Sequence, residues 1–64
     1  MTPAQQEQYR RVFGGLDRGE REELLQEWYD AGGCEAACPN GCWVEPDGTC
    51  EHGEPSWFLL LGMI

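Results

Sequence analysis

Lysine is absent from this chain of 64 residues, and positive charge of any kind is scarce. The four basic side chains are all arginines in the first third of the sequence, namely Arg10, Arg11, Arg18 and Arg21. Twelve carboxylates oppose them and give a formal net charge of -8. Because nucleic-acid affinity comes mainly from Lys and Arg side chains that neutralise phosphates, we expect no direct nucleic-acid binding.

The sequence also lacks a long hydrophobic run. Its most apolar stretch, residues 57–64, is far shorter than the roughly 20 residues that span a bilayer as a helix. The first residues show neither the basic region nor the apolar region of a secretory signal. We therefore expect a cytoplasmic protein with no membrane span, whose thiols stay reduced.

No catalytic constellation is visible. The chain has one histidine, no glycine-rich phosphate loop, and no nucleophile with a His/Asp relay. A chain of this length also has little room for a substrate pocket. We expect that the protein is not an enzyme.

What the sequence does contain is a cluster of metal-ligand residues. Four cysteines and the histidine fall within residues 34–52: Cys34, Cys38, Cys42, Cys50 and His52. A domain this small rarely folds without disulfides, a metal or a partner. In a reducing compartment this spacing favours a metal over disulfides or free thiols, which are the alternatives. The preferred ion is Zn2+, and iron or an iron–sulfur cluster is the alternative cofactor.

Residues 42–52 are predicted to form a β-hairpin, with Pro46 and Gly48 in its turn. In a four-residue register, Cys42 and Cys50 would lie on opposite faces. In a three-residue register, Gly48 adopts the left-handed conformation, Cys42 faces His52, and the two cysteines and the histidine project from one face. We favour this second register because the glycine makes it sterically accessible.

The hairpin supplies three ligands, so a fourth must come from the preceding segment. Cys38 is the first choice because its loop to Cys42 is short, and Cys34 is the alternative fourth ligand. One more helical turn over residues 34–38 would bring both sulfurs to one side. An all-thiolate site of four cysteines, with His52 in a supporting role, also fits. Against these possibilities, Cys34 is equally well explained as an ordinary buried thiol. For His52, the alternative to a ligand is a solvated surface histidine.

Two helices are predicted before the cluster. Thr2, Pro3 and Gln5 form a helix start with a capping box, and Gly14-Gly15 ends that helix. Asp17 caps a second helix over residues 18–31, which Gly32-Gly33 ends. Each helix carries apolar residues at helical spacing, which predicts a buried face for each. These residues are Tyr9, Val12, Phe13 and Leu16 in the first helix, and Leu24, Leu25, Trp28 and Ala31 in the second.

A short apolar helix is predicted at the end of the chain, capped by Ser56 and stopped by Gly62. Trp57, Leu60, Leu61 and Ile64 share one face at i, i+3, i+4 and i+7 and would seal the core. The remaining apolar side chains would then be exposed and form an interaction surface, or, as an equal alternative, the two helices wrap the segment on both sides and bury them. This expected surface consists of Phe58, Leu59 and Met63.

The segment Val44-Glu45-Pro46-Asp47-Gly48-Thr49-Cys50-Glu51-His52-Gly53, followed by Pro55-Ser56-Trp57, resembles a group of short prokaryotic and phage-type proteins with a zinc-ribbon-like Cys-x-His signature near the C-terminus. The resemblance covers about the last third of the chain. It implies a small metal-binding module and carries no known activity or substrate.

Together these patterns predict one α+β metal-stabilised domain over residues 1–64. Its parts are a helical pair (1–33), a Cys/His loop and hairpin (34–54) and an apolar helix (55–64). The predicted function is a small zinc-binding protein whose metal is structural and which docks on a protein partner or on itself. The alternatives are an acidic nucleic-acid mimic that inhibits a protein with a basic groove, and a thiol-based metal-handling or redox protein.

Overall fold

Three helices and one two-stranded antiparallel sheet make up the computed structural model, which describes residues 1–64. The α+β class expected from the sequence is confirmed. None of the helices combines the length and apolar character needed to cross a lipid bilayer. In chain order the elements are α1 (Pro3–Phe13), α2 (Arg18–Asp30), β1 (Cys34–Glu35), β2 (Trp43–Val44) and α3 (Trp57–Leu60).

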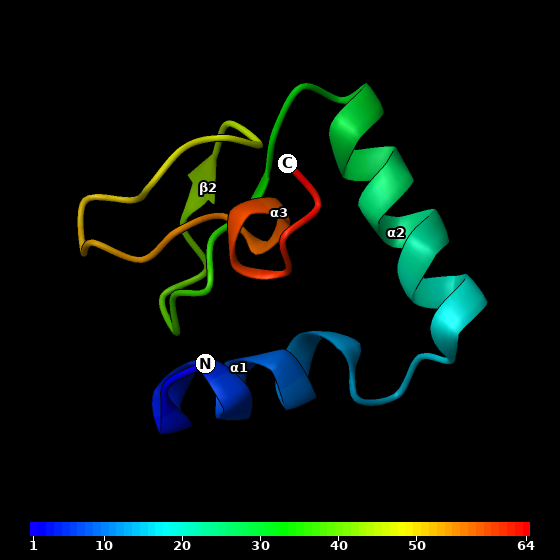
Figure 1. The fold of residues 1–64 in the computed structure, drawn as a ribbon, viewed down its shortest axis with the longest axis horizontal. Helices are drawn as coiled ribbons and strands as arrows, with labels where there is room; N and C mark the ends of the chain where they lie inside the picture. Colours follow the sequence, from blue (N-terminus) through cyan, green and yellow to red (C-terminus); the bar gives the residue numbers. More distant parts are fainter.

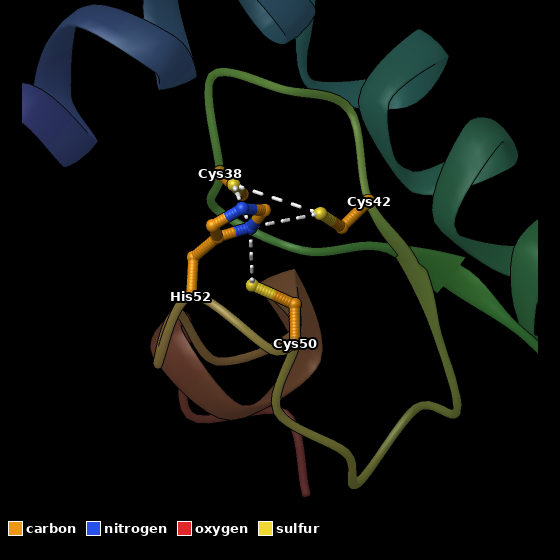
Figure 2. Close-up of side chains that lie close together, drawn as sticks. All are labelled: Cys38, Cys42, Cys50 and His52. Carbon is orange, nitrogen blue, oxygen red and sulfur yellow. Dashed lines mark hydrogen bonds between the residues drawn. The ribbon is translucent and has the colours of Figure 1, made fainter.

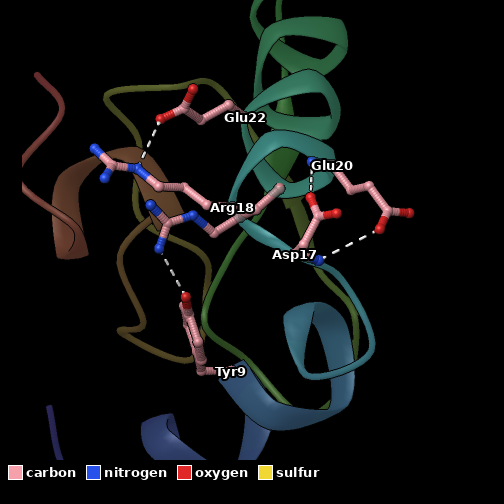
Figure 3. A network of polar contacts seen from close by, with 6 residues as sticks. Tyr9, Asp17, Arg18, Glu20 and Glu22 are labelled. Carbon is pink, nitrogen blue, oxygen red and sulfur yellow. Dashed lines mark hydrogen bonds and ion pairs between the residues drawn. The ribbon is translucent and has the colours of Figure 1, made fainter.

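Both long helices begin at the predicted caps. The Thr2 side chain accepts the backbone N–H of Gln5, and the Gln5 side chain accepts the N–H of Thr2 in return. Asp17 and Glu20 make the same reciprocal pair at the start of α2, as Figure 3 shows. Such boxes satisfy backbone donors that the first turn of a helix leaves without partners.

The two long helices are set at a steep angle, with α3 in the angle between them (Figure 1). A salt-bridge pair on α2, Arg18 with Glu22, lies on its exposed surface. The link between the helices is instead Arg21, whose guanidinium donates to the Tyr9 hydroxyl of α1 at 2.8 Å. Figure 3 shows that hydroxyl reaching toward α2.

An aromatic core fills the space between the helices. Phe13 packs edge-on against Trp57 and Trp28, with ring centroids 5.3 and 6.0 Å apart. Trp57 is fully buried. The predicted apolar faces of α1 and α2 are confirmed except at Ala31, which is exposed. The core cluster consists of Phe13, Leu25, Trp28, Cys34, Ala37, Trp57 and Phe58.

The predicted hairpin register is wrong. Val44 pairs with Cys34, and Trp43 pairs with Glu35, so β2 joins β1 rather than residues 49–52. Cys34–Glu35 is therefore a strand and not a further helical turn. The turn at Glu45–Gly48 does form, because the Gly48 N–H donates to the Glu45 carbonyl at 2.8 Å.

The cause of this difference lies in another glycine. Gly48 does not adopt a positive φ, whereas Gly53 does, at 82°. Gly53 lets residues 49–55 close on themselves, with Thr49 bridged to Pro55 and the Cys50 N–H donating to the Glu54 carbonyl. Thr49 and Cys50 therefore pair within their own loop and do not pair with residues 44 and 45, as the expected long hairpin required.

The C-terminal segment matches its prediction only in part. Ser56 caps α3, and Gly62 stops it with a φ of 72°, as expected. Phe58, however, is only 4% exposed and belongs to the core, so the expectation that it forms an exposed surface is wrong. Leu59 is half-buried and Met63 is exposed. Ile64, expected to seal the core, is 60% exposed, because the chain turns at Gly62 and leaves the helical face.

Candidate metal centre

Two short loops bring the Cys/His cluster together. The first loop, residues 36–42, leaves β1 and returns to β2. The Ala36 N–H donates to the Cys42 carbonyl, and the Gly41 N–H donates to the Cys38 carbonyl at 3.0 Å. Gly41 adopts a φ of 68°, which makes the tight reversal between Cys38 and Cys42 possible. The loop therefore places two thiols four residues apart on one side.

The second loop, residues 49–55, carries the other two donors. The Gly53 N–H donates to the Cys50 carbonyl at 2.9 Å, which closes a tight turn around Glu51 and His52. Ser56 fixes the base of this loop, because its N–H donates to the Gly48 carbonyl and its hydroxyl donates to the Pro46 carbonyl. Cys50 and His52 thus project from a backbone that is tied down at both ends.

The ligand atoms of Cys38, Cys42, Cys50 and His52 all lie within 4.8 Å of one another. The His52 Nδ1 atom is 3.5, 3.3 and 3.9 Å from the sulfurs of Cys38, Cys42 and Cys50 respectively. The sulfurs of Cys38 and Cys42 are 3.7 Å apart. Figure 2 shows the three sulfurs and the imidazole facing one common point.

These spacings can be compared with the edges of a coordination tetrahedron. With zinc–sulfur bonds of about 2.3 Å and a zinc–nitrogen bond of about 2.0 Å, tetrahedral angles place two sulfurs roughly 3.8 Å apart and a sulfur and a nitrogen roughly 3.5 Å apart. The Cys38–Cys42 sulfur separation and the three sulfur–nitrogen separations lie within a few tenths of an ångström of these values, and the two remaining sulfur–sulfur separations, both to Cys50, are no more than 4.8 Å. The cluster could therefore hold a metal ion with four protein ligands.

The thiols of the cluster differ in how readily they ionise. Desolvation, followed by hydrogen bonds to the Cys38 and Cys50 thiols, raises the pKa of Cys42 to about 11. Desolvation also acts on Cys50, but it is outweighed there. Backbone N–H groups of Glu54 and His52 donate to the Cys50 sulfur and lower its pKa to about 7. Backbone donors aimed at a sulfur also orient it and stabilise it as a thiolate ligand.

Additional contacts hold the two loops in place. The Asn40 side-chain amide lies 3.8 Å from the Cys38 sulfur, where it donates from within the first loop. The Gln5 side chain of α1 donates to the Glu54 carboxylate at 3.2 Å, which ties the second loop to the helical half. Gln5 is itself buried. The first contact orients the Cys38 thiol, and the second holds the loop that carries Cys50 and His52 against α1.

Cys34, the alternative fourth ligand, lies outside the cluster. Its side chain is fully buried in the aromatic core. Burial raises the pKa of the Cys34 thiol, although a side-chain hydrogen bond with Ser56 and the backbone N–H groups of Trp57 and Phe58 act in the opposite direction. Cys34 therefore anchors the start of α3 and is the ordinary buried thiol of the alternative interpretation. All four cysteines are free of disulfide bonds.

The cluster opens toward the surface on the side of its histidine. His52 is exposed and Cys42 is half-buried, whereas Cys38 and Cys50 are buried. Sequence reasoning selected these four residues but missed what brings them together. The signal that was available is a glycine next to a ligand in each loop, Gly41 and Gly53.

Comparison with known proteins gives no relative: no family model, curated protein or solved structure matches the chain.

Proposed function

We propose that this chain is a small zinc-binding protein whose ion is structural and which acts as a protein-interaction module. The observation that carries the zinc proposal is the convergence of three sulfurs and one imidazole nitrogen within 4.8 Å of one another, with four of the separations, 3.3–3.9 Å, close to the edges of a tetrahedral Cys3His site. Two separate loops supply two ligands each, so an ion at the centre would fix one loop against the other.

A structural role follows from the number of donors. Four protein ligands fill the four positions of tetrahedral zinc, whereas a catalytic zinc site keeps one position open for water or substrate. Little apolar surface is buried around the cluster, where only Ala36, Cys38 and Cys50 are buried. The metal would supply the stabilisation that hydrophobic packing supplies elsewhere.

The donor set supports zinc over iron. Cys3His is among the usual ligand sets of structural zinc. Iron–sulfur clusters normally use four thiolates, and the fourth thiol, Cys34, lies in the aromatic core. A thiol-based redox role has less support for the same reason, because the one cysteine outside the cluster is inaccessible.

Metal analysis of the purified, tag-free protein under reductant tests the proposal. Native mass spectrometry is expected to show one zinc ion per chain, and Cys38→Ser or Cys50→Ser to lose it. The matched control is Cys34→Ser, which removes a cysteine outside the cluster and is expected to keep the ion. A Cys34→Ser variant without zinc, or a wild-type protein that stays fully folded after exhaustive chelation, would contradict the proposal.

A further inference from the structure

An apolar groove runs along the surface between α2 and the C-terminal segment. Its α2 wall is a single helical face, with residues at i, i+3, i+4 and i+7. In Figure 1 the C-terminal segment leaves α3 on the side that faces α2. The groove is lined by Glu22, Leu25, Gln26, Tyr29, Phe58, Met63 and Ile64.

The groove has a buried floor and exposed apolar edges. Leu25 and Phe58 form the floor and belong to the aromatic core. Tyr29, Met63 and Ile64 are large hydrophobic residues that are 58%, 50% and 60% exposed. Exposed apolar groups gathered around one depression, rather than scattered singly, are typical of interaction sites.

The charge around the groove is negative. Glu22 lines it, and Gln26 donates its amide to the Asp30 carboxylate at 3.1 Å along the outer edge. Glu23 and Asp30 each lie one turn from Gln26 on the exposed side of α2. Both arginines at the start of α2 have partners: Arg18 is paired with Glu22 at 3.5 Å, and Arg21 donates to the Tyr9 hydroxyl of α1. From Glu22 to Ile64 the chain contains nine carboxylates and no Lys or Arg.

We propose that this groove binds a basic amphipathic segment of another protein, with apolar side chains in the groove and Lys or Arg along the α2 edge. The inference rests on the proposed interaction function and names its surface and partner chemistry. A second copy of this chain fits poorly, because it would bring another net charge of -8 against the same acidic edge. A positively charged partner gains from both the apolar contact and the charge.

The test uses the zinc-loaded full chain and three synthetic helical peptides. All three carry Leu at i, i+3, i+4 and i+7, and their other positions are Lys, Gln or Glu. Amide chemical shifts of the labelled protein are followed during titration at 50 and 300 mM salt. The Lys peptide is expected to bind tightest, to shift amides of α2 and of residues 58–64, and to weaken at the higher salt.

Variants separate the apolar from the electrostatic part. Ile64→Ser is expected to weaken binding about fivefold, and Glu23→Gln with Asp30→Asn about threefold, with a smaller salt dependence. Two matched controls are expected to stay within about twofold of wild type. Trp43→Ser removes an equally exposed apolar side chain outside the groove. Glu45→Gln with Asp47→Asn removes two exposed charges that do not line the groove.

Each other outcome overturns the proposal. Equal binding of the Glu and Lys peptides excludes a basic partner, and shifts outside the groove exclude this surface. Concentration-dependent dimers in sedimentation that Ile64→Ser abolishes would assign the groove to a second copy. A folded, zinc-loaded protein that binds none of the peptides contradicts the groove proposal alone and leaves the structural zinc standing.

Discussion

Around Trp57, the structure buries seven side chains that include four large aromatic or aliphatic groups besides that tryptophan. Around His52, it buries only two cysteines and one alanine, and the histidine itself is exposed. The two regions are neighbours, and Val44 packs against both. The first region has enough apolar surface to hold its own shape, whereas the second has four donor atoms in its place. With an ion bound to these donors, as proposed, the small domain would divide its stability between packing in one region and coordination in the other.

Removing a ligand should have the largest effect, because it acts where packing is weakest. Cys50→Ser is expected to lower zinc affinity on the order of 100-fold or more, since structural sites gain about 10–16 kcal/mol from four ligands together. Competition with a chromophoric chelator measures this affinity. In the same variant, aromatic near-UV circular dichroism should persist in part, because none of the four ligand side chains belongs to the core around Trp57. Complete loss of that signal would mean that the two regions do not differ in this way.

A change in the aromatic core should lower the free energy of unfolding while leaving the four metal ligands in place. Trp57→Ala is expected to cost about 3–5 kcal/mol, because it removes a fully buried indole and leaves a cavity next to Phe13. Urea denaturation with saturating zinc provides the measurement. Tyr29→Ala is a suitable comparison, since it removes an aromatic ring that is mostly exposed, and it should cost less than about 1 kcal/mol. Equal losses in the two variants would place the stabilising core elsewhere.

The pH dependence of metal binding should reveal the unequal thiols of the cluster. Cys42, with a pKa of about 11, gives up its proton to the metal throughout the neutral range. Cys50, with a pKa of about 7, is already a thiolate above that pH and must be deprotonated by the metal only below it. Zinc affinity should therefore rise with pH, and more steeply below pH 7, by up to about tenfold more per pH unit. If the logarithm of the zinc affinity instead rises with pH at one constant slope from pH 5.5 to 8.5 in chelator competition, Cys50 does not have the lowered pKa expected in the folded cluster.

The smallest effect is expected at the contact between the two regions. Glu54→Ala removes the acceptor of the Gln5 amide but keeps the backbone N–H of residue 54 that faces the Cys50 sulfur. We expect a loss of about 1–2 kcal/mol, because the buried amide of Gln5 loses its partner. Glu51→Ala, a change at an exposed neighbour, is the control and should be nearly neutral. Thermal unfolding of both zinc-loaded variants checks the difference.

The parts of the fold that depend on neighbouring residues could be predicted from the sequence. The caps at Thr2 and Asp17, and the stop at Gly62, need only side chains and glycines a few residues away. The pairing of β2 could not be predicted in this way. It depended on whether Gly48 or Gly53 would take the positive φ, and both fit a turn locally. Tertiary contacts of Ser56 with Pro46 and Gly48 decide between them.

The cluster illustrates the same limit. The sequence indicated which four side chains would meet, because short loops and a Cys-x-His pair restrict the choice. The predicted backbone arrangement was wrong, since Cys42 and His52 lie on two separate loops and not on the paired strands of one hairpin. The place of Cys34 depended on packing, and only the completed core around α3 excludes it from the cluster.

The segment from Cys34 to Cys38 distributes its side chains between the two regions. Cys34 and Ala37 belong to the aromatic core, while Ala36 and Cys38 belong to the cluster. The length of this segment therefore cannot change freely. An insertion or deletion of a single residue would move either Cys34 out of the core or Cys38 away from the other three residues of the cluster. The interval of three residues between these cysteines looks like a chelating motif. It is better understood as the distance the backbone needs to cross from one interior to the other.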